Sequence, residues 1–282
     1  MRVRVPTVPL HSLGSMMAKK SPYLHKLTDE VGGSIHSLNT IAVSLSHLSN
    51  STTTPAGLNI TWKPVNVGGA SKNARRFAIR SSIVFHAEML FEYLSELSKD
   101  PFWSPSGINF NIALKSQDSK AKRVSAFCKS IPGIEREWVV LTELMCHWRN
   151  KIVHAKSNAN ISSKDKQFLQ SKSNDIYKDY YHFDVDKAIS DFRADKVTLK
   201  EATTLTTFLI KCCNAIDDHY LNLVNNTKIA DVISILNKER DFVVLTKQSK
   251  GEKRTRQIER WLEVNYSIFS PALIKDLVEH YT

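Results

Sequence analysis

The most reactive side chains of the sequence are concentrated in one segment, residues 134–157. Four polar side chains there recur at helical spacing, which would place them on one face of a helix: Glu143, His147, Asn150 and His154. Glu143 and His147 are one turn apart, so the carboxylate could raise the pKa of the imidazole and the pair could support a reactive site. Alternatively, the pair is solvated or faces a dimer partner, and His154 is a surface histidine. A metal site is disfavoured because the segment lacks the H-E-x-x-H order and a fourth ligand.

The opposite face of the same segment is apolar and predicts the side that enters the core. Its large side chains also recur every three or four residues: Trp138, Leu141, Met145, Trp148 and Ile152. Arg149 lies at the edge of this stripe, about 140° from His154 on an ideal helix. The two side chains can therefore meet if Arg149 swings round, if the helix loosens near its end, or if two copies meet in a symmetric dimer.

Residues 149–154 read R-N-x-x-x-H near the end of this long apolar helix. The sequence resembles the Arg-x4–6-His motif of the HEPN-domain ribonucleases, in which an Asn often follows the Arg. The Asn, the apolar helix that carries the motif, a second long helix upstream and the all-α pattern of the chain strengthen the resemblance. It covers about residues 70–226.

The resemblance implies a helical bundle that forms a homodimer with two motifs in one shared cleft. It implies an endoribonuclease that needs no metal or other cofactor. In such enzymes the 2′-hydroxyl attacks the adjacent phosphate, leaving a 2′,3′-cyclic phosphate and a 5′-hydroxyl. Carried over, His154 is the general acid or base, Arg149 holds the scissile phosphate, and Asn150 orients His154 or donates to a phosphate oxygen. HEPN ribonucleases commonly serve as toxins or antiphage defence effectors, so an antitoxin or regulatory protein is an expected partner.

Helices are expected to position this motif. Hydrophobic spacing predicts a long helix over 71–98 that Ser71 caps, and a short helix over 118–130. A third long helix is expected from the capping box at residues 198–201 to about Leu223. Between them, Asp184 should cap a short helix after a polar, Lys- and Ser-rich stretch. Few glycines argue against an all-β fold, so we expect an all-α chain, a HEPN-like bundle with extra helical segments at both ends.

The chain divides into four expected segments. Residues 1–16 look like an expression scar because Gly14-Ser15 precede a methionine. Residues 17–66 are expected to form a helix interrupted at Gly32-Gly33, followed by a loop that continues to about residue 70. The bundle follows over 67–226. Residues 227–282 are expected to form a basic tail of two or three short helices, the last starting at Ser270-Pro271.

The net charge of the chain is +11, and +9 without the two arginines of the expected scar, which suggests a polyanionic partner. Basic residues that could contact RNA lie at the start of the helix over 71–98 and within the motif: Lys72, Arg75, Arg76, Arg80 and Lys151. A further basic run over 247–260 could bind nucleic acid or a protein. Two other hypotheses therefore stand beside the nuclease: a non-catalytic HEPN-like module that binds RNA or protein, and a DNA-binding regulator acting through the tail.

The location of the protein can also be predicted. No stretch of 18 apolar residues occurs, so no transmembrane helix and no membrane partner are expected. No signal peptide is recognisable. The four cysteines contain no C-x-x-C pair and are expected to be buried, reduced thiols of a cytoplasmic protein.

Overall fold

The computed structural model describes residues 20–47, 67–112, 119–154 and 157–282. Within these ranges the chain forms helices, turns and loops without a strand, which confirms the expected all-α class. Two compact units divide it, one over Tyr23–His219 and a smaller one that contains Tyr220–Thr282. The expected scar and most of the expected loop over 50–70 lie outside the described residues.

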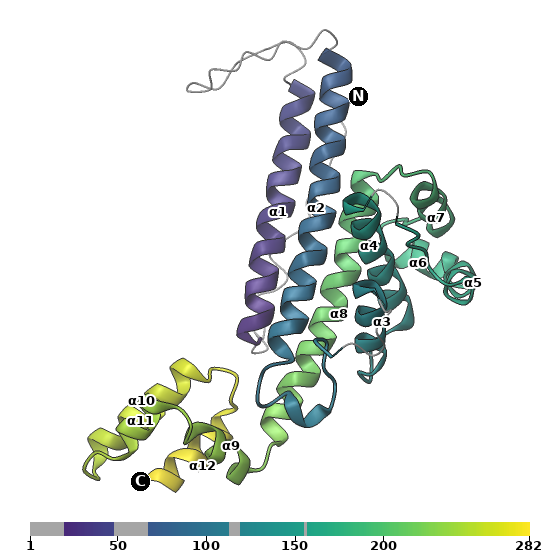
Figure 1. Cartoon of the computed structure of the whole chain (residues 1–282). Coiled ribbons are helices and arrows are strands. Elements are labelled where there is room, and N and C mark those ends of the chain that lie inside the picture. The colour runs from purple at the N-terminus through teal and green to yellow at the C-terminus, as the bar shows by residue number, and fades with distance from the viewer. Residues whose placement is uncertain (1–19, 48–66, 113–118, 155–156) are drawn as a thin grey trace. The chain divides into compact units, whose positions relative to one another are not determined.

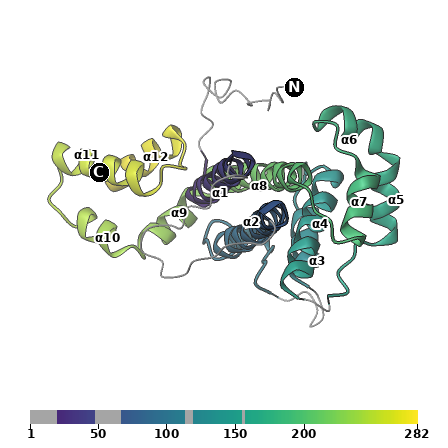
Figure 2. The ribbon, with the colours of Figure 1, turned by 90° about the horizontal axis from the view of Figure 1, so that it is seen from above.

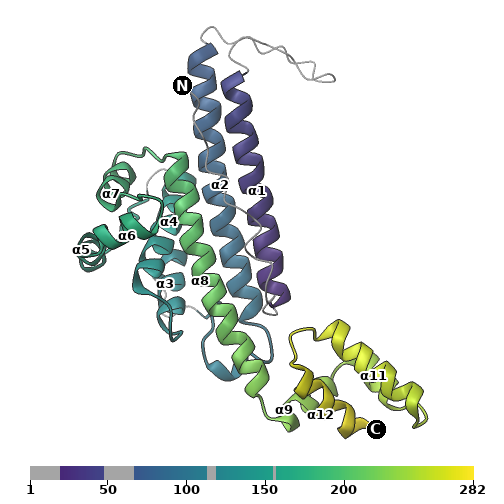
Figure 3. The same cartoon turned by 180° about the vertical axis from the view of Figure 1, so that it is seen from behind.

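Four long helices form the frame of the larger unit: α1 (Pro22–His47), α2 (Val67–Leu97), α4 (Arg136–Val153) and α8 (Leu199–Asn226). Figures 1 and 3 show α1, α2 and α8 running side by side, and Figure 2 shows α4 against α2 on the side away from α1. The predicted interruption at Gly32-Gly33 is wrong. Leu27, Val31 and Leu38 are buried on both sides of the glycine pair, and this packing outweighs the poor helix propensity of glycine.

The core of the larger unit lies between α2, α4 and α8, with α3 (Lys120–Lys129) packed on α4. Helix α2 begins at Val67, one turn before the predicted cap at Ser71, and a short 3-10 turn follows it at Ser104–Ser106. All four cysteines are buried in this core and free of disulfides: Cys128, Cys146, Cys212 and Cys213. The thiols therefore behave as small apolar side chains.

Three short helices lie beside α4: α5 (Ser163–Ser171), α6 (Ser173–Asp179) and α7 (Val185–Arg193). The sequence pattern missed α5 and α6, because each buries only one large apolar side chain, Leu169 or Ile176. The two predicted caps in this region are present. Asp184 accepts from the backbone N–H of Lys187 at 2.9 Å.

The capping box at the start of α8 is also present. Glu201 accepts from the backbone N–H of Thr198 at 2.8 Å, and the Thr198 hydroxyl accepts from the N–H of Glu201 at 3.2 Å. Each side chain therefore satisfies a backbone donor that the first turn of the helix leaves free.

The smaller unit has four helices rather than the two or three expected: α9 (Ile229–Leu236), α10 (Arg240–Thr246), α11 (Glu252–Asn265) and α12 (Pro271–Tyr281). Ser270 caps α12 as predicted, with its hydroxyl accepting from the N–H of Leu273 at 3.2 Å. Arg254 of the basic run is buried and donates to the carbonyls of Thr246, Gln248 and Tyr281. This arginine therefore holds the unit together. Among the described residues, no helix is both long and apolar enough to cross a membrane.

Candidate active site

The motif lies where α4 ends. The last helical residue is Val153, and His154 has an extended backbone with φ −120° and ψ 104°. The N–H of His154 still donates to the carbonyl of Asn150 at 2.9 Å, and this bond closes the last turn of α4. Because the chain leaves the helix at this point, the imidazole of His154 turns back toward Arg149. The Nη1 of Arg149 lies 3.4 Å from the Nε2 of His154. Of the three ways in which the sequence allows these side chains to meet, the structure shows the second, in which the helix ends and the chain turns.

The contact between Arg149 and His154 indicates which ring nitrogen of His154 accepts a hydrogen bond. A guanidinium only donates hydrogen bonds, so the Nε2 of His154 must accept from Arg149. The proton of a neutral ring then lies on Nδ1. His154 is exposed, so the site places an imidazole at the protein surface with its Nε2 lone pair directed at the guanidinium of Arg149.

Glu88 of α2 holds Arg149 in place. The Nε of Arg149 donates to the Oε1 of Glu88 at 2.6 Å, and the Nη2 contacts the same oxygen. The other carboxylate oxygen of Glu88 lies 3.5 Å from the Nζ of Lys120. Only 16% of the Arg149 side chain is exposed. One edge of the guanidinium is therefore occupied by Glu88, and its Nη1 end faces His154.

Sequence reasoning did not find Glu88. Its signal in the sequence is isolation, because no aspartate or glutamate occurs between Glu30 and Glu88. A single carboxylate that follows a long acid-free stretch and lies among the apolar residues of α2 requires a cationic partner when it is partly buried. The sequence alone gives no indication that this partner is Arg149, which is 61 residues away.

Asn150 contacts Arg149 through its side chain. The Oδ1 of Asn150 accepts from the Nη1 of Arg149 at 3.2 Å. The orientation of His154 by the Asn150 side chain stays a prediction, because the bond between the two residues runs from the N–H of His154 to the backbone carbonyl of Asn150, which any residue could supply. Asn150 thus helps to aim the same guanidinium end that faces the imidazole.

Glu143 and His147 lie inside the bundle, so the expectation that they share an open polar face with His154 is wrong. Their exposed fractions are 6% and 3%, and the Oε1 of Glu143 lies 3.3 Å from the Nε2 of His147. The reason is that every residue of α4 from Val139 to Trp148 is buried, on both faces of the helix. The predicted i, i+4 pair exists, but it has no access to a ligand in solvent.

The basic residues proposed to contact RNA fall into two groups. Lys72 and Arg75 are exposed on α2. Arg76 and Arg80 both bind Asp195, with shortest contacts to Oδ2 of 3.2 and 2.9 Å. Asp195 therefore neutralises part of this charge and fixes two of the arginines against the α7–α8 connection.

Lys151 has a structural role that the sequence did not indicate. Its Nζ donates to the carbonyls of Phe192 at 2.5 Å and Arg193 at 3.3 Å, at the end of α7. The ammonium group also lies 4.7 Å from the centre of the Phe192 ring. A cation at the carbonyl end of a helix is favourable, so Lys151 ties α7 to the end of α4.

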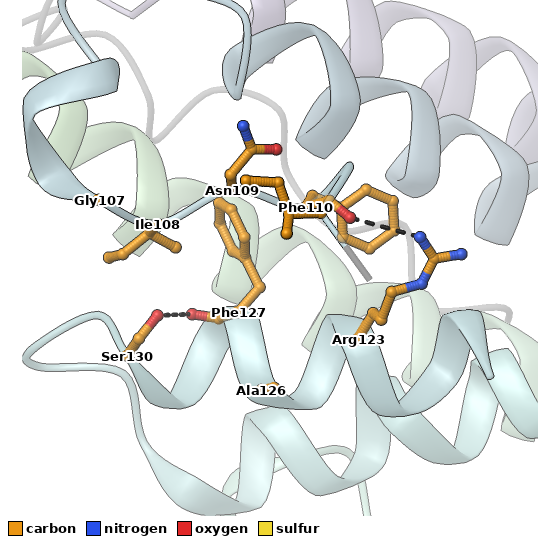
Figure 4. A pocket seen from close by; sticks show the side chains of 9 residues that line it. Gly107, Ile108, Asn109, Phe110, Arg123, Ala126, Phe127 and Ser130 are labelled. Atoms are coloured by element: carbon orange, nitrogen blue, oxygen red, sulfur yellow. Dashed lines mark hydrogen bonds between the residues drawn. The ribbon is translucent and has the colours of Figure 1, made fainter. Parts of the chain in front are cut away.

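A small cavity of about 220 Å³ lies elsewhere in the larger unit, between α3 and the segment that follows the 3-10 turn. Figure 4 shows Phe110 and Phe127 in its wall, with Arg123 pointing toward the carbonyl of Phe110 at 3.5 Å. None of the motif residues lines it. This cavity is therefore separate from the Arg149–His154 pair, in which His154 is exposed and 16% of the Arg149 side chain is exposed.

Comparisons with protein-family models, with curated proteins and with solved structures found no match for this chain. Within the described ranges, no group of three or more His, Cys, Asp or Glu side chains is arranged to hold a metal ion. A proposal for the function therefore rests on the geometry of the site and on the motif.

Proposed function

We propose that this chain is an endoribonuclease of the HEPN type that cleaves RNA without a metal ion. The observation that carries the proposal is the contact between the Nη1 of Arg149 and the Nε2 of His154, 3.4 Å apart at an exposed helix end. A proton acceptor beside a cation is the minimal equipment for transferring a phosphoryl group between oxygens. The R-N-x-x-x-H sequence supports the same conclusion.

In the proposed reaction, the substrate phosphate replaces His154 as the acceptor of the Arg149 Nη1 hydrogen bond, and the freed Nε2 of His154 takes the proton of a ribose 2′-hydroxyl. The 2′-oxygen then bonds to the adjacent phosphorus, and the bond from phosphorus to the 5′-oxygen breaks. Arg149 donates hydrogen bonds to the phosphoryl oxygens, which carry additional negative charge in the transition state. The products are a 2′,3′-cyclic phosphate and a 5′-hydroxyl.

The leaving 5′-oxygen needs a proton, and the two other histidines of α2 and α4 are unsuited to provide it. His147 is buried. His86 is also buried, and burial lowers its pKa to about 4, so the ring is neutral at physiological pH. We therefore propose that the second group comes from another copy of the chain, with the His154 residues of a homodimer sharing one cleft.

Glu88 and Asn150 are positioning residues in this proposal. Their contacts at 2.6 and 3.2 Å fix the guanidinium of Arg149, so that its Nη1 group is directed toward the imidazole. Preorganised donors stabilise a transition state without being reordered during the reaction. Lys120, which also contacts Glu88, offsets the negative charge that Glu88 brings to an anion-binding site.

The biological setting is part of the same proposal. A metal-independent RNase in the cytoplasm is harmful to its own cell, which fits a toxin or an antiphage effector held in check by an antitoxin or regulatory protein. The four buried, free thiols are compatible with a reducing compartment.

The test is incubation of the purified protein with total RNA in EDTA, followed by analysis of the new ends. We expect 2′,3′-cyclic phosphates and 5′-hydroxyls, and at least a roughly 100-fold loss of cleavage in His154→Ala and Arg149→Ala. His36→Ala is the matched control, because this side chain is exposed on another helix, α1.

Three outcomes would favour other functions. Cleavage that requires a divalent metal, or that persists in both site variants, contradicts the proposed chemistry. Tight binding of RNA that stays intact favours the non-catalytic RNA-binding module. Binding of duplex DNA without binding of RNA favours a regulator that acts through the basic tail.

A further inference from the structure

Phe77 is a large apolar side chain in an unusual position. It lies on α2 with 73% of its surface exposed. Among the described side chains of α2, it is the single large hydrophobic one with such exposure. The N-terminal turns of this helix extend beyond α4 and α8 in Figures 1 and 3. An exposed aromatic ring is a surface on which a ligand with a flat apolar face can stack.

Phe77 is in line with the candidate active site. It precedes Glu88 by three helical turns, so the two residues lie within about 20° of one another around α2 and about 17 Å apart along its axis. Ser81 and Val84 lie between them on the same stripe. A chain that follows this stripe therefore passes from Phe77 to the Arg149–Glu88 pair.

The surface on one side of Phe77 is basic. Lys72, Arg76 and Arg80 recur every four residues and form a stripe about 60–140° from Phe77 around the helix, whereas Arg75 lies about 160° away, on the opposite face. No acidic residue occurs in α2 before Glu88. Asp195 of the α7–α8 connection, with φ +55°, accepts hydrogen bonds from Arg76 and Arg80 and fixes these two α2 side chains against that connection.

We propose that this surface, the α2 platform, binds single-stranded RNA and stacks an unpaired base on Phe77. The α2 platform consists of Lys72, Arg76, Phe77 and Arg80. The cations contact phosphates, and the ring stacks a base some nucleotides away from the scissile bond. The inference rests on the proposed function, because it places the platform on the path to the Arg149–His154 pair.

The charge of the platform selects this ligand over other occupants. A second copy docked face to face would bring two sets of like charges together, which is unfavourable. An apolar protein partner would need a wider hydrophobic patch than one ring. A base-paired duplex keeps its bases stacked inside, so the ring favours single strands over duplexes.

The experiment measures binding in a His154→Ala background, so that no cleavage by His154 interferes. Fluorescence anisotropy with a labelled, unstructured single-stranded RNA oligonucleotide gives Kd. We expect Phe77→Ala to raise Kd by about 5- to 100-fold, the range for loss of one base–aromatic stack. Phe77→Tyr should restore binding and Phe77→Leu should not. The matched control is Tyr177→Ala, which removes an exposed aromatic ring from α6.

A second arm separates this proposal from the proposed function. A dinucleoside monophosphate is too short to reach from the Arg149–His154 pair to Phe77, so wild-type protein and Phe77→Ala should cleave it at equal rates. An unchanged Kd in Phe77→Ala refutes the platform and leaves the nuclease intact. No cleavage of any RNA, with binding still dependent on Phe77, refutes the nuclease and leaves the platform. Loss of the dimer in Phe77→Ala by sedimentation velocity assigns the ring to a protein interface and overturns the proposal.

Discussion

Replacing Glu88 by glutamine tests how Arg149 is positioned. The glutamine oxygen can still accept from the Nε of Arg149, but the negative charge is lost and the amide cannot accept from Lys120. We expect kcat to fall because the guanidinium is less firmly oriented toward His154. We expect KM for RNA to fall as well, because a negative charge beside the proposed phosphate site is gone.

The size of the effect follows from the contacts. Hydrogen bonds to charged groups contribute about 1.5–3 kcal/mol, and neutral ones about 0.5–1.5 kcal/mol. The Arg149 side chain is 16% exposed and that of Glu88 is 36% exposed, so solvent weakens the pair. A loss of about 1 kcal/mol in the free energy of unfolding is therefore expected. The same loss in the transition state lowers kcat roughly fivefold.

The assay combines urea unfolding with steady-state cleavage in EDTA. The matched control is Glu92→Gln, one turn further along α2, which breaks an exposed ion pair with Lys26. That variant should keep nearly the stability of the wild type and cleave like it, because solvent screens the exposed ion pair. If Glu88→Gln cleaves with an unchanged or higher kcat while Glu92→Gln behaves as expected, Glu88 does not position Arg149 for catalysis.

Two further predictions concern the bundle that carries the site. Burial, together with the neighbouring Asp191, raises the pKa of Glu201 to about 7 from 4.5. The stability that the protein gains from a protonated Glu201 is therefore fully present below pH 4.5 and is lost as the pH rises through 7. Glu201→Gln should remove this loss of stability, so that above pH 7 the variant is more stable than the wild type by up to about 3 kcal/mol in urea titrations. An unchanged pH profile would contradict it. The four buried thiols should resist a thiol-specific disulfide reagent in the native protein and all react in urea, and rapid native reaction would refute their burial.

Local signals in the sequence predicted local structure well. The caps at Asp184, Ser270 and the Thr198–Glu201 box are present because each depends on a side chain and a backbone group within three residues. The all-α class followed from the same helical periodicity. Gly32-Gly33 shows the limit of this reasoning, because the burial of the apolar side chains of α1 outweighs the low helix propensity of the two glycines.

The site was predictable in its residues and less so in its geometry. Arg149 and His154 could be selected from the motif, but their contact depends on the helix ending at Val153, which a regular helical projection does not contain. The same helical projection predicted that His147 lies on an exposed face, because it cannot show that α4 is buried on both faces from Val139 to Trp148. Glu88 was out of reach because its pairing with Arg149 joins two helices that only the folded chain brings together.

The most direct test uses an RNA with one 2′-deoxy nucleotide on the 5′ side of a mapped cleavage site, in EDTA. Because the proposed nucleophile is the 2′-oxygen, cleavage at that linkage should disappear while cleavage at other linkages continues. Wild-type protein that still cuts the 2′-deoxy linkage would show that water or another group is the nucleophile. That result would contradict the role assigned to Arg149 and His154.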